Sequence, residues 1–176
     1  MKKLIQLILA GIMILPMSLN AQNNAKSFVQ QYKKQEGFTV VTIGKPVMKI
    51  LRLFENAMDG NDAAMIRCVD VIHVLNFEGG RDGTRGKPFI SEALTFCEAN
   101  RYEELIEVVE QHETLKFLGK TDGEYITSLI VLTYSNGGNN AEMVCLTGNL
   151  TIDVLQAFYG GKGTKKNVEF RYFSFI

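Results

Sequence analysis

The sequence predicts an α+β fold, in which two or three helices pack on a mostly antiparallel sheet within a single domain. Tight-turn signals at Asp122-Gly123 and at 136–140 join β-branched and aromatic runs, as in an antiparallel meander. Apolar residues recur at helical spacing after Pro46 and Pro88, and proline is common in the first turn of a helix. The roughly 155 residues that remain without an N-terminal leader suit one domain.

The first 21 residues have the pattern of a secretory signal peptide. Lys2 and Lys3 supply the positive charge, residues 4–17 are almost entirely apolar, and Ala21 offers the small residue that signal peptidase needs. The apolar run is shorter than the roughly 20 residues that span a bilayer. We therefore expect residues 1–21 to be removed and the mature chain to be periplasmic or extracellular. Since no cysteine ends the leader, lipid anchoring through an N-terminal Cys is not expected.

The mature chain is expected to begin with a polar lead-in over residues 22–36, followed by the domain over 37–176. FTVVTI at 38–43 is short and β-branched, which predicts a strand. A helix follows Pro46, with one apolar stripe at helical spacing: Val47, Leu51, Phe54 and Met58. A helical turn near 63–67 precedes a strand at 69–77, which is apolar on nearly both faces and therefore central.

The second half of the chain alternates one helix with several strands. A loop with four glycines at 78–87 leads into a helix that begins at Pro88 and ends near Asn100. The segment 102–110 fits a helix about as well as a strand by its period. Further strands are expected at 114–119, 125–134, 142–147 and 168–175, with a short helix at 149–159.

Several of these segments together resemble the DUF4252 family, small exported proteins of Bacteroidetes-type bacteria. They are GFTVVTIGKPVMKIL, VDVIHVLNFE, YEELIEV after the Pro88 helix, and MVCLTGNLTIDVLQAF, and the resemblance covers about 32–158. It implies an α+β domain in the cell envelope, with a strand at 102–109. Many relatives look like lipoproteins, whereas this chain lacks the lipobox Cys. The family has no established activity, so the resemblance carries over no catalytic residues.

Charge and composition exclude two classes of partner. Without the leader lysines the chain carries 17 basic and 19 acidic residues, a net charge of about −2, so it lacks the basic face of a nucleic-acid binder. No second apolar run is long enough to span a bilayer. Two alternatives stay open for Cys68, Cys97 and Cys145: three buried thiols, or one disulfide and a spare thiol.

The glycine-rich loop is a candidate anion site. Consecutive backbone N–H groups before a helix N-terminus, together with Arg81, Arg85 and Lys87, are the groups that hold an anion. The Walker pattern fails, because Pro88 occupies the position of the magnesium-binding hydroxyl. A polar connecting loop is the alternative interpretation.

The aromatic tail is a candidate partner surface. Phe170 and Tyr172 share one face of the expected last strand, and Phe173 and Phe175 share the other. Aromatic residues on both faces indicate either a buried strand or one face available to another chain.

No set of residues specifies a reaction. Neither GxSxG nor HExxH occurs, and Cys68 and His73, five residues apart, would lie on opposite faces of a strand. We therefore expect no metal and no cofactor, and a non-catalytic domain that binds an envelope protein or a small ligand. The alternatives are a hydrolase whose site, for example a Cys meeting a His, assembles from distant residues, and a structural or signalling accessory protein.

Overall fold

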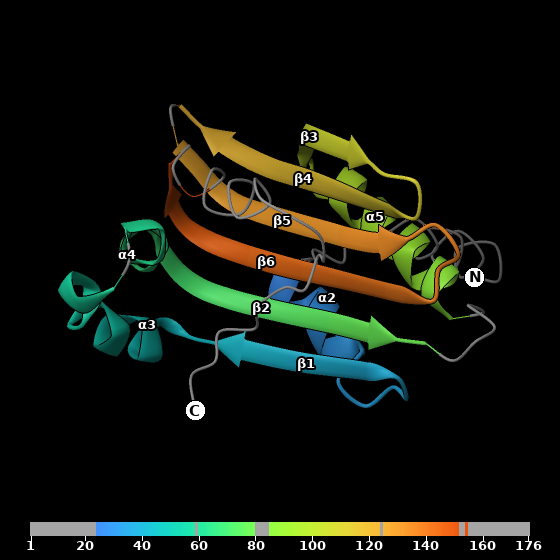
Figure 1. Cartoon of the computed structure of the whole chain (residues 1–176), viewed down its shortest axis with the longest axis horizontal. Helices are drawn as coiled ribbons and strands as arrows, with labels where there is room; N and C mark the ends of the chain where they lie inside the picture. Colours follow the sequence, from blue (N-terminus) through green and yellow to red (C-terminus); the bar gives the residue numbers. More distant parts are fainter. Residues whose placement is uncertain (1–23, 59, 80–84, 124, 152–153, 155–176) are drawn as a thin grey trace, which may run out of the picture.

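The computed structural model describes residues 24–58, 60–79, 85–123, 125–151 and 154. Six antiparallel strands form one sheet in the order β1-β2-β6-β5-β4-β3 (Figure 1). Helices pack against this sheet, so the predicted α+β class is confirmed.

The strands follow the predicted order along the chain and are mostly longer than expected. They are β1 Phe38–Ile43, β2 Val69–Glu78, β3 Glu103–Val109, β4 Glu113–Asp122, β5 Tyr125–Ser135 and β6 Asn140–Leu150. The expected turns join β4 to β5 and β5 to β6, where Gly123 and Gly138 adopt φ values of +61° and +75°. Positive φ is readily available only to glycine, which explains these residues at these turns.

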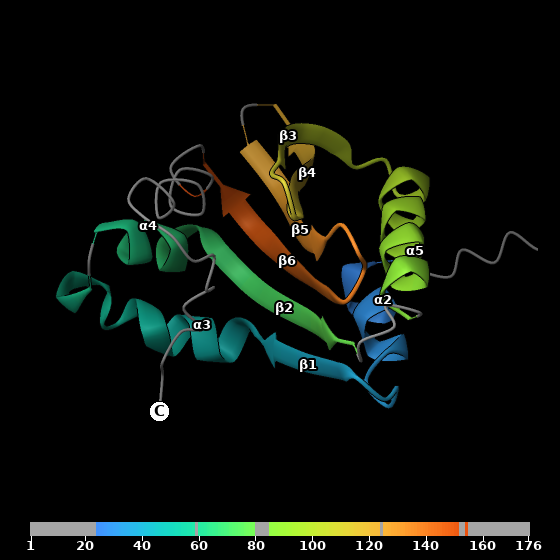
Figure 2. The ribbon, with the colours of Figure 1, turned by 45° about the vertical axis from the view of Figure 1, so that its right-hand side comes forward.

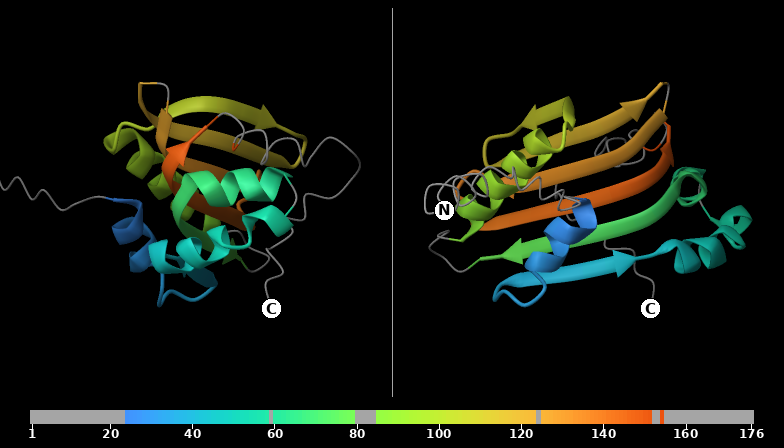
Figure 3. Two further views of the ribbon diagram at one scale, coloured as in Figure 1. Left: turned by 90° about the vertical axis from the view of Figure 1, so that its left-hand side faces the viewer. Right: turned by 180° about the vertical axis from the view of Figure 1, so that it is seen from behind.

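Helices α2 (Ala25–Gln31) and α5 (Gly86–Ala99) cover one face of the sheet, as Figure 3 shows from behind. Phe28 and Val29 of α2 are 8% and 0% exposed and belong to the same core as Phe89 of α5. The lead-in expected at 22–36 therefore contributes a helix to the core, because its few apolar residues recur on one side of that helix.

Helices α3 (Lys45–Arg52) and α4 (Gly60–Cys68), with the short 3₁₀ turn η1 (Glu55–Ala57), lie at one end of the sheet (Figure 2). Met48 and Ile66 join a second core with Leu129, Leu146 and other residues of the opposite sheet face. β6 reaches this end through Gly148, where a Cβ would lie 2.1 Å from the carbonyl oxygen of Cys68. Only a residue without a side chain allows so close an approach.

Two expectations differ from the structure. The helix after Pro46 ends at Arg52, and it turns Met48 toward the core while Val47 and Phe54 are exposed. Asn149 and Leu150, expected to open a helix over 149–159, belong to β6. Residues 152–153 and 155–159 of that expected helix, and the strand expected at 168–175, lie outside the described residues.

Candidate functional site

An exposed apolar surface on α3 and the two residues after it is the most prominent surface feature of the described chain. Val47, Ile50, Leu53 and Phe54 are 49%, 57%, 78% and 58% exposed. Val47 and Ile50, three residues apart, lie on one side of α3, and Leu53 and Phe54 follow directly where the helix ends. We call these four residues the α3 surface. Large apolar side chains clustered at this exposure are typical of a surface that binds another molecule.

The sequence of α3 explains why this surface faces outward. Pro46 lies in the first turn, and Met48, fully buried, anchors the opposite side of the helix in the second core. Five of the eight residues of α3 are apolar, and its three charged residues share one side. The apolar side is therefore too wide for the core alone to cover, and part of it faces solvent.

Arg52 fixes the position of α3 against the junction of α4 and β2. Its guanidinium donates hydrogen bonds to the carbonyl oxygens of Ile66 at 3.0 Å and Val69 at 2.7 Å, and to Asp70 Oδ1 at 3.0 Å. Lys45 Nζ lies 3.4 Å from the other carboxylate oxygen of Asp70. The hydrogen bond from Arg52, with the charge of Lys45, holds the pKa of Asp70 below its ordinary value despite some burial.

Basic residues border the α3 surface. Lys45, Lys49 and Arg52 belong to the same helix, which has no acidic residue in its first turn. The side chain of Lys45 remains 66% exposed although it pairs with Asp70. The exposed apolar residues therefore have basic residues along one side, of which Arg52 directs its guanidinium to the junction of α4 and β2.

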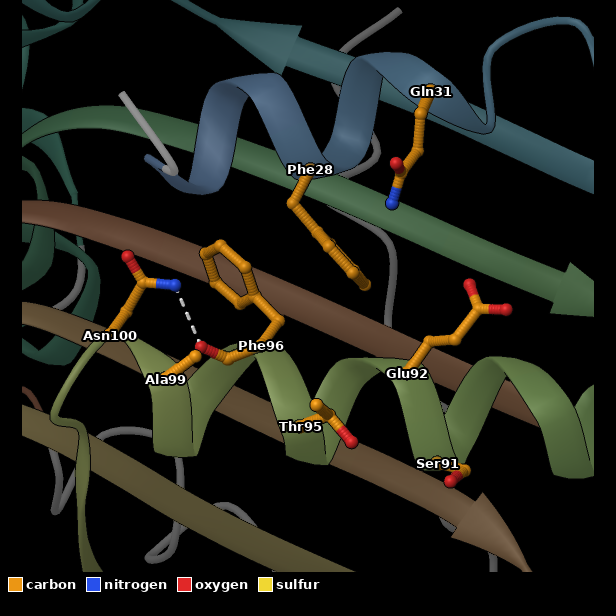
Figure 4. Close-up of a pocket in the computed structure, with 8 residues that line it drawn as sticks. All are labelled: Phe28, Gln31, Ser91, Glu92, Thr95, Phe96, Ala99 and Asn100. Carbon is orange, nitrogen blue, oxygen red and sulfur yellow. Dashed lines mark hydrogen bonds between the residues drawn. The ribbon is translucent and has the colours of Figure 1, made fainter. Parts of the chain in front are cut away.

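A groove of about 360 Å³ lies between α2 and α5 (Figure 4). Phe28 and Phe96 face one another across it, with ring centroids 4.5 Å apart. Asn100 donates its amide to the carbonyl oxygen of Phe96 at 2.8 Å, and the hydroxyl of Tyr32 donates to the Glu92 carboxylate. Burial, reinforced by Glu92, raises the pKa of Tyr32. These polar groups thus bind other groups of the same chain, and the two rings are in contact. The groove is therefore the packing boundary between α2 and α5.

Of the three residues predicted to bind an anion, the structure describes Arg85 and Lys87, and these two have different surroundings. Arg81 lies outside the described residues. Arg85 donates to the carbonyl oxygen of Glu36 at 3.3 Å and pairs with its carboxylate at 3.5 Å. Lys87 lines a second groove of about 360 Å³, between α5 and the β5–β6 turn, whose other lining residues include Ile90 and Tyr134. The pairing of Arg85 with an acid competes with any external anion.

One histidine and one cysteine lie side by side in the sheet. His73 of β2 is the register partner of Cys145 of β6, and Nδ1 of His73 lies 3.0 Å from Oγ1 of Thr42. Burial raises the pKa of the Cys145 thiol above its ordinary range, and it raises that of Cys97 to about 12. Burial, and next the charge of Lys26, lowers the pKa of His73. A protonated thiol is a poor nucleophile, so this arrangement does not activate a cysteine.

All three cysteines are free thiols. Of the two alternatives expected, three buried thiols or one disulfide with a spare thiol, the structure agrees with the first for Cys97 and Cys145, which are buried. Cys68 is partly exposed. Within the described part of the chain, no group of three or more His, Cys, Asp and Glu side chains could hold a metal ion.

The carboxyl group of Glu142 has a raised pKa, and the sequence did not single this residue out. It lies on β6, with Asn76 of β2 and Thr133 of β5 as register partners. Burial, and next the charge of Glu113, raises its pKa to about 7. The buried hydroxyl of Thr133 makes no hydrogen bond within the described chain. An acidic residue inside the otherwise apolar run 141–146 was the available signal, but only the sheet register reveals these neighbours.

The acidic residues of β3 serve a structural role. Lys116 of β4 binds Glu104 at 2.7 Å and Glu107 at 2.6 Å. Burial disfavours the charge on Lys116, but these hydrogen bonds outweigh it and raise the pKa of Lys116. Paired in this way, the carboxylates hold the β3–β4 edge together.

The predicted partner surface of Phe170, Tyr172, Phe173 and Phe175 lies outside the described residues. Among the helices that the structure describes, none has both the length and the apolar character needed to cross a membrane.

Comparisons with known proteins place the chain in a family. No curated protein matches it significantly, and no solved structure does. A family model described as "Domain of unknown function (DUF4252)" matches residues 32–158, which include all six strands and helices α3, α4 and α5. Because this match covers more than half of the 176 residues, the chain belongs to the DUF4252 family.

Proposed function

We propose that this protein is an exported, non-catalytic domain of the cell envelope that binds a partner protein through the α3 surface. The exposure of Leu53 and Phe54, 78% and 58%, is the observation that carries this proposal. Burying such side chains against a partner removes apolar area from water, at roughly 25 cal/mol per Å² before the costs of association.

The border of the α3 surface defines the chemistry of that partner. Lys45, Lys49 and Arg52 lie on one side of α3, beside the exposed apolar residues, and Lys45 and Arg52 pair with Asp70, so these four charged groups together are net positive. A complementary protein surface would present an apolar centre and acidic residues at its rim, where such charges guide association and select among partners.

The alternative function, a hydrolase that uses a cysteine, has less support. Cys97 and Cys145 are buried, and burial raises the pKa values of both thiols. Glu142 favours an acid–base variant of that alternative, since a carboxyl group with a pKa of about 7 can both donate and accept a proton near neutral pH. Turnover of an envelope substrate that Glu142→Gln abolishes would support the enzyme and count against the binding role.

Affinity capture tests the binding role. The tagged protein, expressed from its full coding sequence, serves as bait for a solubilised envelope fraction beside a Leu53→Glu/Phe54→Glu variant. Val109→Glu is the matched control, because Val109 is an exposed valine, 67% accessible, at the opposite edge of the sheet. We expect a discrete protein that the wild type and the control retain and the double variant loses, because a carboxylate in an apolar contact is costly to bury.

Two results would contradict the proposal. One is equal retention of the same proteins by the double variant. The other is binding of the wild type, but not of the double variant, to phosphatidylglycerol vesicles that contain no other protein. That result would show that the α3 surface binds lipid.

The exported location has a separate test. The leader pattern predicts that protein recovered from the periplasm or the medium begins at Gln22. N-terminal sequencing of that material is the measurement, and an intact Met1 on material confined to the cytosol would refute export.

A further inference from the structure

The two edges of the sheet differ in how they are protected. β3 carries Glu103, Glu104 and Glu107, and its register with β4 shifts between Glu104 and Ile106. Charged side chains and register shifts at an edge discourage another strand from pairing there. β1, with the sequence FTVVTI, contains no charge and no proline, and it pairs with β2 without a register shift.

β1 also has the features of a strand that accepts a neighbour. It is the last strand on its side of the described sheet, so alternate residues direct their N–H and C=O groups away from β2. At its centre Val41 is 46% exposed, although valine is a residue that strands favour for packing against neighbours.

We propose that β1 binds β1 of a second copy of this chain, antiparallel and about a two-fold axis through Val41, so that two six-stranded sheets become one. Antiparallel pairing of a strand with itself is self-complementary, as a two-fold interface requires. With the axis at Val41, Thr39 lies opposite Ile43 of the second copy on one face, and Val40 lies opposite Thr42 on the other. Each pair then joins β-branched side chains, and the two Val41 side chains cover one another.

The charges at the two ends of β1 match this arrangement. Glu36 precedes the strand with its side chain 89% exposed, and Lys45 follows it with its side chain 66% exposed. Within the chain Glu36 pairs with Arg85 and Lys45 with Asp70, but both side chains keep most of their exposure. In this register Lys45 of one copy lies opposite Gly37 of the other, one residue from Glu36, twice across the axis. Opposite charges at the rim of an interface favour this register and partner over others.

This inference does not depend on the proposed function, because it concerns a different surface and a different partner. Leu53→Glu/Phe54→Glu should leave the dimer intact, whereas Val41→Lys should leave the α3 surface unchanged. Failure of one proposal is therefore distinguishable from failure of the other.

Sedimentation velocity over a range of protein concentrations tests the dimer. Expressed from its full sequence, the wild type should sediment with twice the mass of one chain. Val41→Lys places a charge at the paired edge and should raise the dimer dissociation constant by roughly tenfold or more. Val109→Lys, at the β3 edge, is the matched control and should remain dimeric, with circular dichroism showing both variants folded.

Cross-linking tests the register independently of any effect on folding. Val41→Cys, in a Cys68→Ser background, should form a covalent dimer under mild oxidation, because directly opposed Cβ atoms, about 4.5–5.5 Å apart, need only a small adjustment to reach disulfide distance. Val109→Cys in the same background should not. A wild type that is monomeric at every concentration would overturn the proposal, and so would a dimer that Val41→Lys leaves unchanged. A chain that dimerises only after deletion of residues 168–176 would also overturn it, by showing that its own tail occupies the edge.

Discussion

Glu142 is the side chain that should make the stability of this fold depend on pH. Burial, with the nearby charge of Glu113, raises its pKa from the ordinary 4.5 to about 7. Between these values the folded chain holds more protons than the unfolded chain, so the free energy of unfolding falls as pH rises. The expected loss is about 1–2 kcal/mol, less than the full 1.4 kcal/mol per pKa unit because water reaches part of the side chain.

Urea unfolding of Glu142→Gln between pH 5 and pH 8 checks this expectation. The variant should be more stable than the wild type by about 1–2 kcal/mol at pH 8, with the difference shrinking toward pH 5. The difference between the two proteins is the relevant quantity, because the lowered pKa of His73 gives the opposite slope in both. Glu103→Gln, at an exposed position on β3, is the control. A difference that is constant across this range would show that Glu142 ionises normally.

At the scale of elements, the α3 surface depends on how Arg52 attaches α3 to the rest of the fold. Three hydrogen bonds link its guanidinium to two main-chain carbonyls and to Asp70. Arg52→Ala leaves these acceptors without their donor and should lower the free energy of unfolding by about 2–3 kcal/mol. Arg52→Lys should recover only part of this loss, since an ammonium cannot reproduce the planar geometry of the guanidinium.

Arg67→Ala is the comparison for Arg52→Ala. Arg67 is an exposed arginine of α4 that pairs with Glu55 at 3.7 Å, and its loss should cost less than about 1 kcal/mol. Urea unfolding midpoints measure both variants. Equal effects of the two substitutions would mean that Arg52 does not hold α3 in place.

Local sequence predicted the elements better than it predicted their environments. FTVVTI correctly predicted a strand, and Asp122-Gly123 correctly predicted a hairpin turn. Both signals depend on β-branching or turn chemistry within a few residues. The segment 102–110 was ambiguous by period, and the family resemblance correctly indicated β3. Which part of the apolar side of α3 faces the core could not be predicted, since that side is wider than the core contact and the choice depends on where α4 and β2 lie.

The candidate site was less predictable than the fold. The α3 surface was missed because the stripe through Val47 and Phe54 predicted an amphipathic helix without showing that these two side chains remain exposed. Glu142 was missed because its neighbours come from β2, β4 and β5, and register between distant strands is set by the whole sheet. The predictions for Arg81 and for the aromatic residues of the tail stay predictions.

At the scale of the whole molecule, the two faces of the sheet are covered differently. α2 and α5 cover one face with a closely packed aromatic core, in which Phe38 contacts Phe77 and Phe89. The other core continues to the end of the sheet, where α3 leaves large apolar side chains in solvent. These exposed apolar side chains, on a well-packed scaffold, support the proposed binding role.

The most direct test of this account is photo-cross-linking in living cells. A photoreactive phenylalanine analogue replaces Phe54, and in a second strain it replaces Tyr125, an exposed aromatic residue on β5 that is 47% accessible. The account predicts a discrete adduct between this chain and one envelope protein at position 54 and none at position 125. An adduct at position 125 alone, or none at either position, would contradict the claim that the α3 surface binds a partner protein.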